Sequence, residues 1–297
     1  MKLIVALLML VPTMLAAQSA IPKAVSETVN LSPRCKKGDL QRYEVKRELR
    51  KLNPDGSQRT HRHDVFAFTQ YCRSNTPENG LEYSITVDSF AVGINLRMDE
   101  DLRPLDRVPQ FDGRSMSSKI NRIFPVKNGC YDVETNFLDT MKYVEAYDFR
   151  EQYLYLRLLE QLRFSAGPKL SKVGDTVTIV LPDLCLKISQ VVNSYKLASA
   201  SHVLELTGLG KYGNRPTALI AIRPSKSSVT VSIWAGDSYS YEGAGTIELS
   251  GNFVVALDDG DIVSAEITER SDVNLVHPDK SENMNSAIKV LNLRQLN

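Results

Sequence analysis

Tryptophan, histidine and cysteine are scarce in this sequence of 297 residues, which holds one Trp, four His and four Cys. An excess of charge of either sign is also missing, because 36 Lys and Arg are balanced by 35 Asp and Glu. This balance excludes the strongly basic surface of a nucleic-acid or polyanion-binding protein. The remaining composition, with 42% hydrophobic and 24% charged residues, excludes disorder, collagen and coiled coil and is typical of a globular protein.

A long hydrophobic run occurs once, in residues 3–15. Lys2 supplies a positive charge before the run, and small residues follow it, which is the pattern of a secretory signal peptide cleaved after Ala17 or Ala20. An uncleaved anchor is the alternative, but a membrane helix needs about 20 apolar residues, more than this run has. We therefore expect a signal peptide over residues 1–20 and a secreted or periplasmic protein that is not integral to the membrane after cleavage.

A β-hairpin is predicted by two strand-like stretches, residues 43–51 and 60–71, that flank the turn sequence Asn53-Pro54-Asp55-Gly56. In a hairpin centred on this turn, the numbers of paired residues sum to about 109 or 110, which places Cys72 opposite position 37 or 38. Cys35 lies two or three residues further out. A small bulge or a frayed strand end would bring Cys35 and Cys72 within bridging distance.

Disulfides are expected because an even number of cysteines in an oxidising compartment is typical of bridges. We favour the pairs Cys35 with Cys72 and Cys130 with Cys185, while the other two connectivities remain alternatives. Zinc ligation is the rival interpretation. No two of these cysteines share the short C-x-x-C spacing that most structural zinc sites use, which disfavours zinc.

Most of the chain shows the period-two alternation of half-buried strands, separated by short Gly, Asn, Pro and Asp turns. The expected organisation is a linker over 21–39, a β-rich domain over 40–270 with two possible halves at 40–135 and 170–270, and a polar C-terminal tail over 271–297. The similar acidic hairpin turns of the two halves fit an internal duplication, or only the generic chemistry of such turns. Short links between neighbouring strands predict an antiparallel sheet.

One long helix is predicted between the two halves, over residues 136–164, which contain no Gly or Pro. Leu154, Leu158 and Leu162 recur at every fourth residue and give an apolar stripe that we expect to pack on the sheet. Asp148 and Glu151 interrupt the extended stripe, so a break or bend is expected there, and Gly167-Pro168 is expected to end the helix. The predicted fold class is α+β, mainly β, with a curved antiparallel sheet and one central helix.

Two sequences look like motifs of known chemistry but fit turns better. The run from Gly208 to Gly213 matches G-x-G-x-x-G, yet a dinucleotide site needs a helix after the motif, and a β-like run follows here. Gly236-Asp237-Ser238 places a serine just after a strand, as lipase-like esterases do, but no D-x-x-H sequence follows to supply a base. We expect a hairpin turn at the first site and a polar turn at the second.

The sequence His61-Arg62-His63-Asp64 is the most reactive-looking cluster. Strand periodicity places His61 and His63 on one face, close enough to share a metal ion, and Asp64 on the other. A third ligand would have to come from a distant part of the chain. The favoured alternative is that both histidines lie on the outer, solvated face of a strand, so His61 and His63 are weak metal candidates.

Two further short motifs accompany these elements: Lys172-Val173-Gly174-Asp175 before a strand, and Gly243-Ala244-Gly245-Thr246 in a late hairpin. With the antiparallel strands and the central helix, they give residues 80–270 a pattern that resembles uncharacterised bacterial secreted β-rich proteins. In those proteins the sheet curves around a helix, as in lipoprotein-carrier-like folds. The resemblance implies an apolar groove inside the curved sheet, and it implies no catalytic residues.

These observations predict an exported, non-enzymatic protein that binds a hydrophobic ligand or a protein partner on the concave side of its sheet. No cofactor is expected. One alternative is a secreted hydrolase or metal-binding protein that uses the region of His61 and His63, or Ser238. Another is a structural or surface-assembly component, which would be recognised by self-association.

Overall fold

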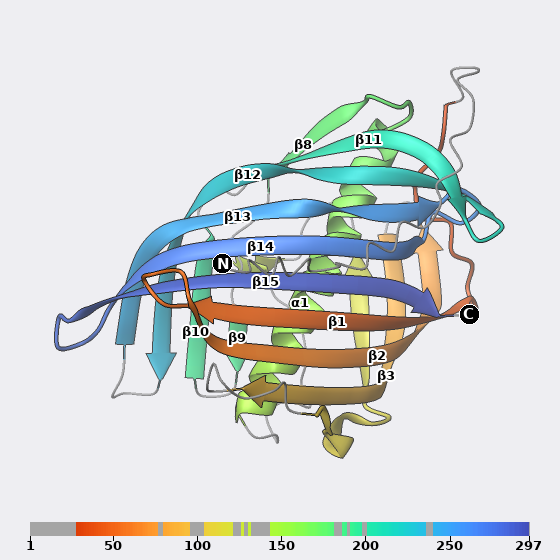
Figure 1. Cartoon of the computed structure of the whole chain (residues 1–297). Helices are drawn as coiled ribbons and strands as arrows, with labels where there is room; N and C mark the ends of the chain where they lie inside the picture. Colours follow the sequence, from red (N-terminus) through yellow and green to blue (C-terminus); the bar gives the residue numbers. More distant parts are fainter. Residues whose placement is uncertain are drawn as a thin grey trace, which may run out of the picture.

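One antiparallel β-sheet makes up most of the structure and curves around a helix (Figure 1). The computed structural model describes residues 28–76, 80–95, 104–120, 126–127, 130–131, 143–180, 186–188, 191–197, 201–235 and 240–296. The expected signal peptide lies outside these residues. The elements are β1 (Leu40–Leu52), β2 (Gln58–Thr76), β3 (Gly80–Asn95), β4 (Asp106–Arg107), η1 (Pro109–Phe111), β5 (Ser115–Ile120), β6 (Val126–Lys127), β7 (Cys130–Tyr131), α1 (Tyr143–Ala166), η3 (Gly167–Lys169), β8 (Thr176–Val180), β9 (Leu186–Ile188), β10 (Val191–Leu197), β11 (Ser201–Tyr212), β12 (Arg215–Ala235), β13 (Ser240–Ala256), β14 (Ile262–Val276) and β15 (Glu282–Leu296).

The main sheet has 13 strands in the order β4-β3-β2-β1-β15-β14-β13-β12-β10-β9. In addition, β5 pairs with β3, while β11 pairs with the first part of β12 and carries β8 on its other side. Strands from both expected halves, 40–135 and 170–270, therefore belong to one sheet. The predicted fold class, mainly β with a curved antiparallel sheet and a central helix, is confirmed.

The β1–β2 hairpin forms at the predicted turn, where Gly56 adopts a φ of 82° that favours glycine. Leu52 pairs with Gln58, which is the predicted register, but a bulge then shifts the remaining pairs by one residue. As a result, the Cys72 amide donates to the Asp39 carbonyl oxygen at 2.9 Å, one position from the predicted partner. The prediction of the hairpin is confirmed, and its register is corrected by one residue.

The predicted disulfide joins Cys35 to Cys72, with 6.4 Å between the two Cα atoms. A tight turn before β1 brings Cys35 back to the sheet, because the Asp39 amide donates to the Lys36 carbonyl oxygen and Gly38 adopts a φ of 104°. Cys185 lies outside the described residues, so the bond between Cys130 and Cys185 stays a prediction.

Residues 28–39, which we name the N-terminal strap, pack against the sheet and are not the polar linker that the sequence predicts. Leu31 is completely buried, and the Val29 amide donates to the Ser171 carbonyl oxygen at 2.8 Å. The Arg34 amide donates to the Asp259 carbonyl oxygen in the β13–β14 turn at 2.6 Å. The linker prediction fails because a polar composition does not prevent a segment from using its backbone groups to bind the sheet.

Gly260 explains how the strap approaches the β13–β14 turn so closely. Its φ is 75°, and a Cβ atom at this position would lie 2.3 Å from the Ser32 carbonyl oxygen. A side chain here would collide with the strap backbone and strain the turn. The strap and the turn therefore depend on this glycine to make contact.

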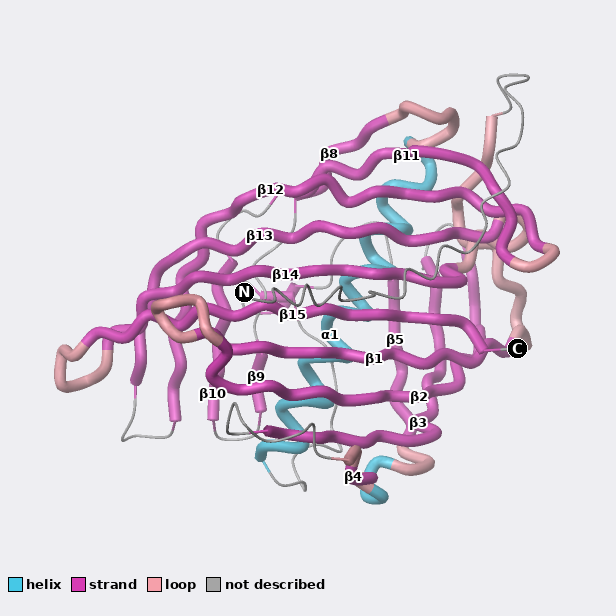
Figure 2. The backbone as a smooth tube through the Cα atoms, viewed as in Figure 1, coloured by secondary structure: helices cyan, strands magenta, loops and turns pink. Residues whose placement is uncertain are grey.

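The helix α1 lies behind the sheet and crosses its central strands, as Figure 2 shows. It is continuous over 24 residues, so of the predicted break or bend near Asp148 and Glu151 the break is wrong. The helix ends at Ala166, before the η3 turn that contains the predicted terminator Gly167-Pro168. A polar residue in the stripe does not stop α1, because its buried face holds polar as well as apolar side chains: Gln152, Arg157, Glu160, Gln161 and Arg163.

The C-terminal residues are not the polar tail that the sequence predicts over 271–297. β14 continues to Val276, and β15 occupies the centre of the sheet between β14 and β1. Ala287, Leu291 and Leu293 are buried at the period of a strand, but Lys289 takes an inward position among them and weakens the apolar alternation. This charged residue is the physical reason why the composition suggests a tail.

β12 is one long strand, although its sequence shows two separate stretches of alternating apolar residues, 218–222 and 229–234. Its first part pairs with β11 and its second part with β10. A register shift between Ile222 and Ser225 separates the two parts. This irregularity lies between the part of β12 that pairs with β11 and the part that pairs with β10.

Candidate functional site

The concave face of the sheet is covered by α1 and filled by side chains. Phe149 of α1 contacts Phe66, Phe90 and Phe111, with ring centroids 4.9, 5.7 and 4.7 Å apart. Aromatic rings at such distances pack as the core of a domain does. A void of about 10 Å³ remains between the helix and the sheet beside Tyr155, which is room for about one water molecule. The groove that the resemblance implies is thus occupied by the protein itself where the chain is described.

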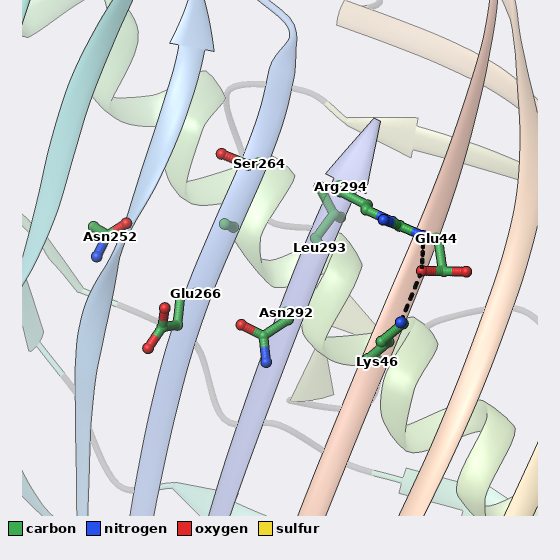
Figure 3. Close-up of a pocket in the computed structure, with 9 residues that line it drawn as sticks. Glu44, Lys46, Asn252, Ser264, Glu266, Asn292, Leu293 and Arg294 are labelled. Carbon is green, nitrogen blue, oxygen red and sulfur yellow. Dashed lines mark ion pairs between the residues drawn. The ribbon is translucent and has the colours of Figure 1, made fainter. Parts of the chain in front are cut away.

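A larger depression lies on the opposite, outer face of the sheet, and we name it the outer groove (Figure 3). It has a volume of about 280 Å³ and spans four neighbouring strands, β13, β14, β15 and β1. Its lining residues are Glu44, Lys46, Asn252, Ser264, Ala265, Glu266, Asn292, Leu293 and Arg294. Strand alternation explains the polar lining, because residues that alternate with the buried ones face outward.

One side of the outer groove holds a small charge network. Arg294 Nη2 lies 2.8 Å from Glu44 Oε1, and Lys46 Nζ lies 3.4 Å from the same oxygen. The other side carries Glu266 together with the amides of Asn252 and Asn292, as Figure 3 shows. The groove therefore offers cationic, anionic and neutral hydrogen-bonding groups within one depression, and no aromatic ring lines it.

The outer groove is hard to predict from the sequence. Outward polar residues on a strand look like an ordinary solvated face. Asn292 and Arg294 also belong to the stretch expected to be a tail. The signal that could have found the groove is the row of polar side chains at paired positions of adjacent strands, where Asn252 pairs with Glu266 and Glu266 with Asn292.

His61 and His63 lie on β2 and do not converge with a third metal ligand among the described residues. Their ring centroids are 6.3 Å apart, and His61 Nε2 lies 3.6 Å from Glu48 Oε2. Burial lowers the pKa of His61, which favours the neutral ring. Asp64 faces the other side of the strand, where Arg47 Nη2 lies 2.5 Å from its Oδ2 atom. Metal binding at His61 and His63 stays a prediction.

The serine candidate Ser238 and its neighbours Gly236 and Asp237 lie outside the described residues. The G-x-G-x-x-G sequence, in contrast, is described. It forms the end of β11 and the turn into β12, with Tyr212 paired to Arg215. A strand follows the motif where a dinucleotide site requires a helix N-terminus.

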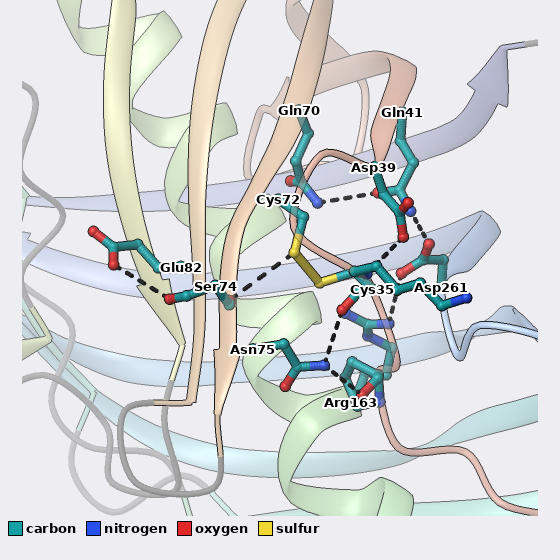
Figure 4. The surroundings of a disulfide bond; sticks show 12 residues. Cys35, Asp39, Gln41, Gln70, Cys72, Ser74, Asn75, Glu82, Arg163 and Asp261 are labelled. Atoms are coloured by element: carbon teal, nitrogen blue, oxygen red, sulfur yellow. Dashed lines mark hydrogen bonds and ion pairs between the residues drawn. A yellow bond between two sulfur atoms is a disulfide. The ribbon is translucent and has the colours of Figure 1, made fainter.

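A second group of polar side chains is buried where the last turn of α1 meets the N-terminal strap (Figure 4). Arg163 is 2% exposed, its Nη1 atom donates to the Gly260 carbonyl oxygen, and it lies 3.5 Å from Asp261 Oδ1. Gln41 Nε2 donates to Asp261 Oδ2. We name Arg163, Asp261 and Gln41 the latch cluster. The side chains of Arg163 and Asp261 are each 2% exposed, and the bonds of the cluster join α1, the β13–β14 turn and β1.

Burial controls the protonation of the latch cluster. It raises the pKa of Asp261 to about 7, although the charge of Arg163 acts in the opposite direction. The neighbouring carboxylate of Asp259 raises the pKa of Asp261 further. Burial also raises the pKa of the two phenols that face the cluster, Tyr43 and Tyr83.

Stability should therefore fall as pH rises from 5 to 8. The folded state holds the Asp261 proton up to about pH 7, whereas an unfolded Asp releases it near pH 4, so the proton stabilises the folded state below that range. For shifts of this size the loss between pH 5 and pH 8 is about 2–3 kcal/mol, and it occurs mainly below pH 7. Urea unfolding at several pH values measures it. Asp261→Asn should flatten the profile, and an unchanged slope in that variant would assign the effect to other groups.

No family model matches the sequence, and no curated protein matches it. A solved structure from Nitrosomonas europaea, described as a "putative AttH", aligns with 87% of this chain and 94% of its own, at 7% identity and a TM-score of 0.20. A likeness at that score carries no argument about either fold or function. The geometry of the described residues is therefore the basis for a functional proposal.

Proposed function

We propose that this chain is an exported, non-enzymatic protein that binds a protein partner through a polar peptide segment in the outer groove. The observation that carries the proposal is the position of the groove. It lies on the face of the sheet that α1 leaves uncovered, whereas the concave face is packed core where it is described. A partner can reach the groove without any rearrangement of the fold.

Export is supported by the disulfide between Cys35 and Cys72, because such bonds persist in secreted and periplasmic proteins and are rare in the cytosol. The N-terminal pattern of residues 1–20 adds the signal peptide that export requires. Within the described part of the chain, no helix has both the length and the hydropathy of a membrane span.

A peptide segment fits the chemistry of the outer groove. Side-chain amides such as those of Asn252 and Asn292 both donate and accept hydrogen bonds, as a peptide backbone does. Glu266 on one side and Arg294 on the other can recognise charges of opposite sign along a partner chain. A hydrophobic ligand finds little in this groove to bind, since polar side chains dominate its lining.

Site-specific photo-crosslinking in the native compartment tests the proposal. A photoreactive phenylalanine analogue at position 292, inside the groove, should give one crosslinked protein. The same analogue at position 50, an exposed outer-face position on β1 outside the groove, is the matched control and should give none. Glu266→Lys should lower the yield at position 292 by at least about fivefold, because it reverses a charge in the contact.

Equal crosslinking at positions 292 and 50 would contradict a specific site, as would a yield that Glu266→Lys leaves unchanged. The hydrophobic-ligand alternative has its own outcome. Native mass spectrometry of the exported protein would then find a lipid in equimolar amount, and the Glu266→Lys variant would retain it. This result would place the binding site in the interior of the protein and not in the outer groove.

A further inference from the structure

β8 forms an edge of the main sheet beyond β11. It pairs with residues 201–205 of β11 on one side, and no other described strand pairs with its second side. Natural sheets usually protect such an edge with a charged residue, a proline, a bulge or a very short strand. The five residues of β8, Thr-Val-Thr-Ile-Val, contain no charge and no proline, and the bulge at Gly174 and Asp175 lies before the strand, on the side that faces β11.

The backbone groups that β8 leaves open follow from the hydrogen bonds at its start. The Gly174 amide donates to the Leu206 carbonyl oxygen at 2.8 Å, and the Leu206 amide donates to the Asp175 carbonyl oxygen at 3.0 Å. This is a bulge that sets the alternation of the ladder. Residues 177 and 179 therefore direct their N–H and C=O groups to β11, and residues 176, 178 and 180 direct theirs to the open side.

These open groups are complementary to those of an identical strand. If a two-fold axis passes beside Thr178, this residue faces its own copy, and Thr176 faces Val180 of the second copy. Each of these pairs can exchange two hydrogen bonds, because all three residues direct their groups outward. No like charges meet, since the strand carries none.

The side chains agree with the same register. Val177 and Ile179 are buried on the concave face. In the two-fold register, Val177 of one copy lies beside Ile179 of the other. Val180 is 61% exposed on the outer face, where Thr176 of the second copy would cover it. Pairing therefore extends the apolar layer of one molecule into that of the next.

Another edge of the sheet, β4, is protected in the usual ways. β4 is two residues long, both of its residues are charged, and Pro109 follows it closely. Because one open edge can pair only once, association through β8 closes at two molecules and does not continue into a filament.

We propose that two copies of this chain dimerise by antiparallel pairing of β8 about Thr178, which joins their sheets into one. A contact of five residues is below the roughly 1,200 Å² of a stable interface, so the dimer should be weak and depend on concentration. The proposal is independent of the outer groove, which lies on other strands.

Analytical ultracentrifugation of the exported, oxidised protein between about 5 and 500 µM tests it, with a dimer fraction that rises over this range. Thr178→Pro removes the outward N–H group and leaves the bonds to β11 in place, so it should weaken dimerisation at least about tenfold. Thr178→Val keeps the N–H group and is the matched control, expected to dimerise as the original protein does.

A protein that stays monomeric over the whole range would overturn the proposal, even if β8 captured a different partner. Dimerisation of Thr178→Pro at the original strength would overturn it too, because the contact would then lie elsewhere. Circular dichroism checks that the proline variant folds. If it does not, Thr178→Lys brings two positive charges together at the axis and should abolish the dimer, and an unaffected dimer would again refute the pairing.

Discussion

Replacement of Arg163 with methionine should lower the free energy of unfolding by about 3–5 kcal/mol at pH 8, where Asp261 is ionised, because it leaves that carboxylate buried without its counter-charge. Arg163 also donates to the Gly260 carbonyl oxygen, so one side chain ties α1 to the β13–β14 turn. Methionine keeps most of the buried apolar volume, which limits the contribution of a cavity to the result. Urea unfolding followed by circular dichroism measures the change.

The matched control is Arg215→Met. Arg215 lies 2.7 Å from Asp258 and 2.5 Å from Asp259 in the same turn, but its side chain is 31% exposed. Ion pairs that water reaches contribute about 0–1 kcal/mol, so this variant should lose far less stability. Equal losses in the two variants would show that burial does not set the contribution of Arg163.

Removal of the Cys35–Cys72 bond should have the second large effect. The bond closes a loop with a sequence separation of 37 residues, and the chain-entropy relation gives about 4 kcal/mol for a loop of that length. The double variant with Cys35→Ala and Cys72→Ala should lose that amount in urea unfolding. Its strap should also exchange amide hydrogens faster than the rest of the sheet, because the strap is anchored there.

The variant with Cys130→Ala and Cys185→Ala serves as the comparison. If these residues form the second predicted bond, this variant also loses stability and the original protein contains no titratable thiol. A loss of less than about 1 kcal/mol in the first double variant would contradict the anchoring role of Cys35 and Cys72.

The elements that the sequence predicts well are those in which local chemistry and packing agree. The β1–β2 hairpin has both a turn sequence and alternating apolar residues, and the Cys35–Cys72 bond follows from that hairpin. The helix has good helix formers and a Gly-Pro terminator. Local signals of this kind predict whether an element is a helix or a strand. They do not predict the register of the β1–β2 hairpin, which depends on a bulge that the sequence does not indicate.

The elements that the sequence does not predict are those that use charge in the interior. Lys289 breaks the apolar alternation of β15, and only the structure reveals its partner, Glu269, at 3.0 Å. Arg163 on α1 looks like a solvated residue until Asp261 is placed beside it. Such pairs join residues that are far apart in the chain, so local patterns contain no information about them. The outer groove escapes prediction for the same reason, since four strands must first be assembled to form it.

The place of β15 beside β1 has a consequence for the order of events during synthesis. Arg42 pairs with Leu296 in the middle of the sheet, so the central ladder cannot close before residue 296 has left the ribosome. Loops of this length make folding slow. Under the export that we propose, the unfinished sheet would leave the chain unfolded while it passes a translocation channel, and the central ladder would close in the compartment where Cys35 and Cys72 are oxidised.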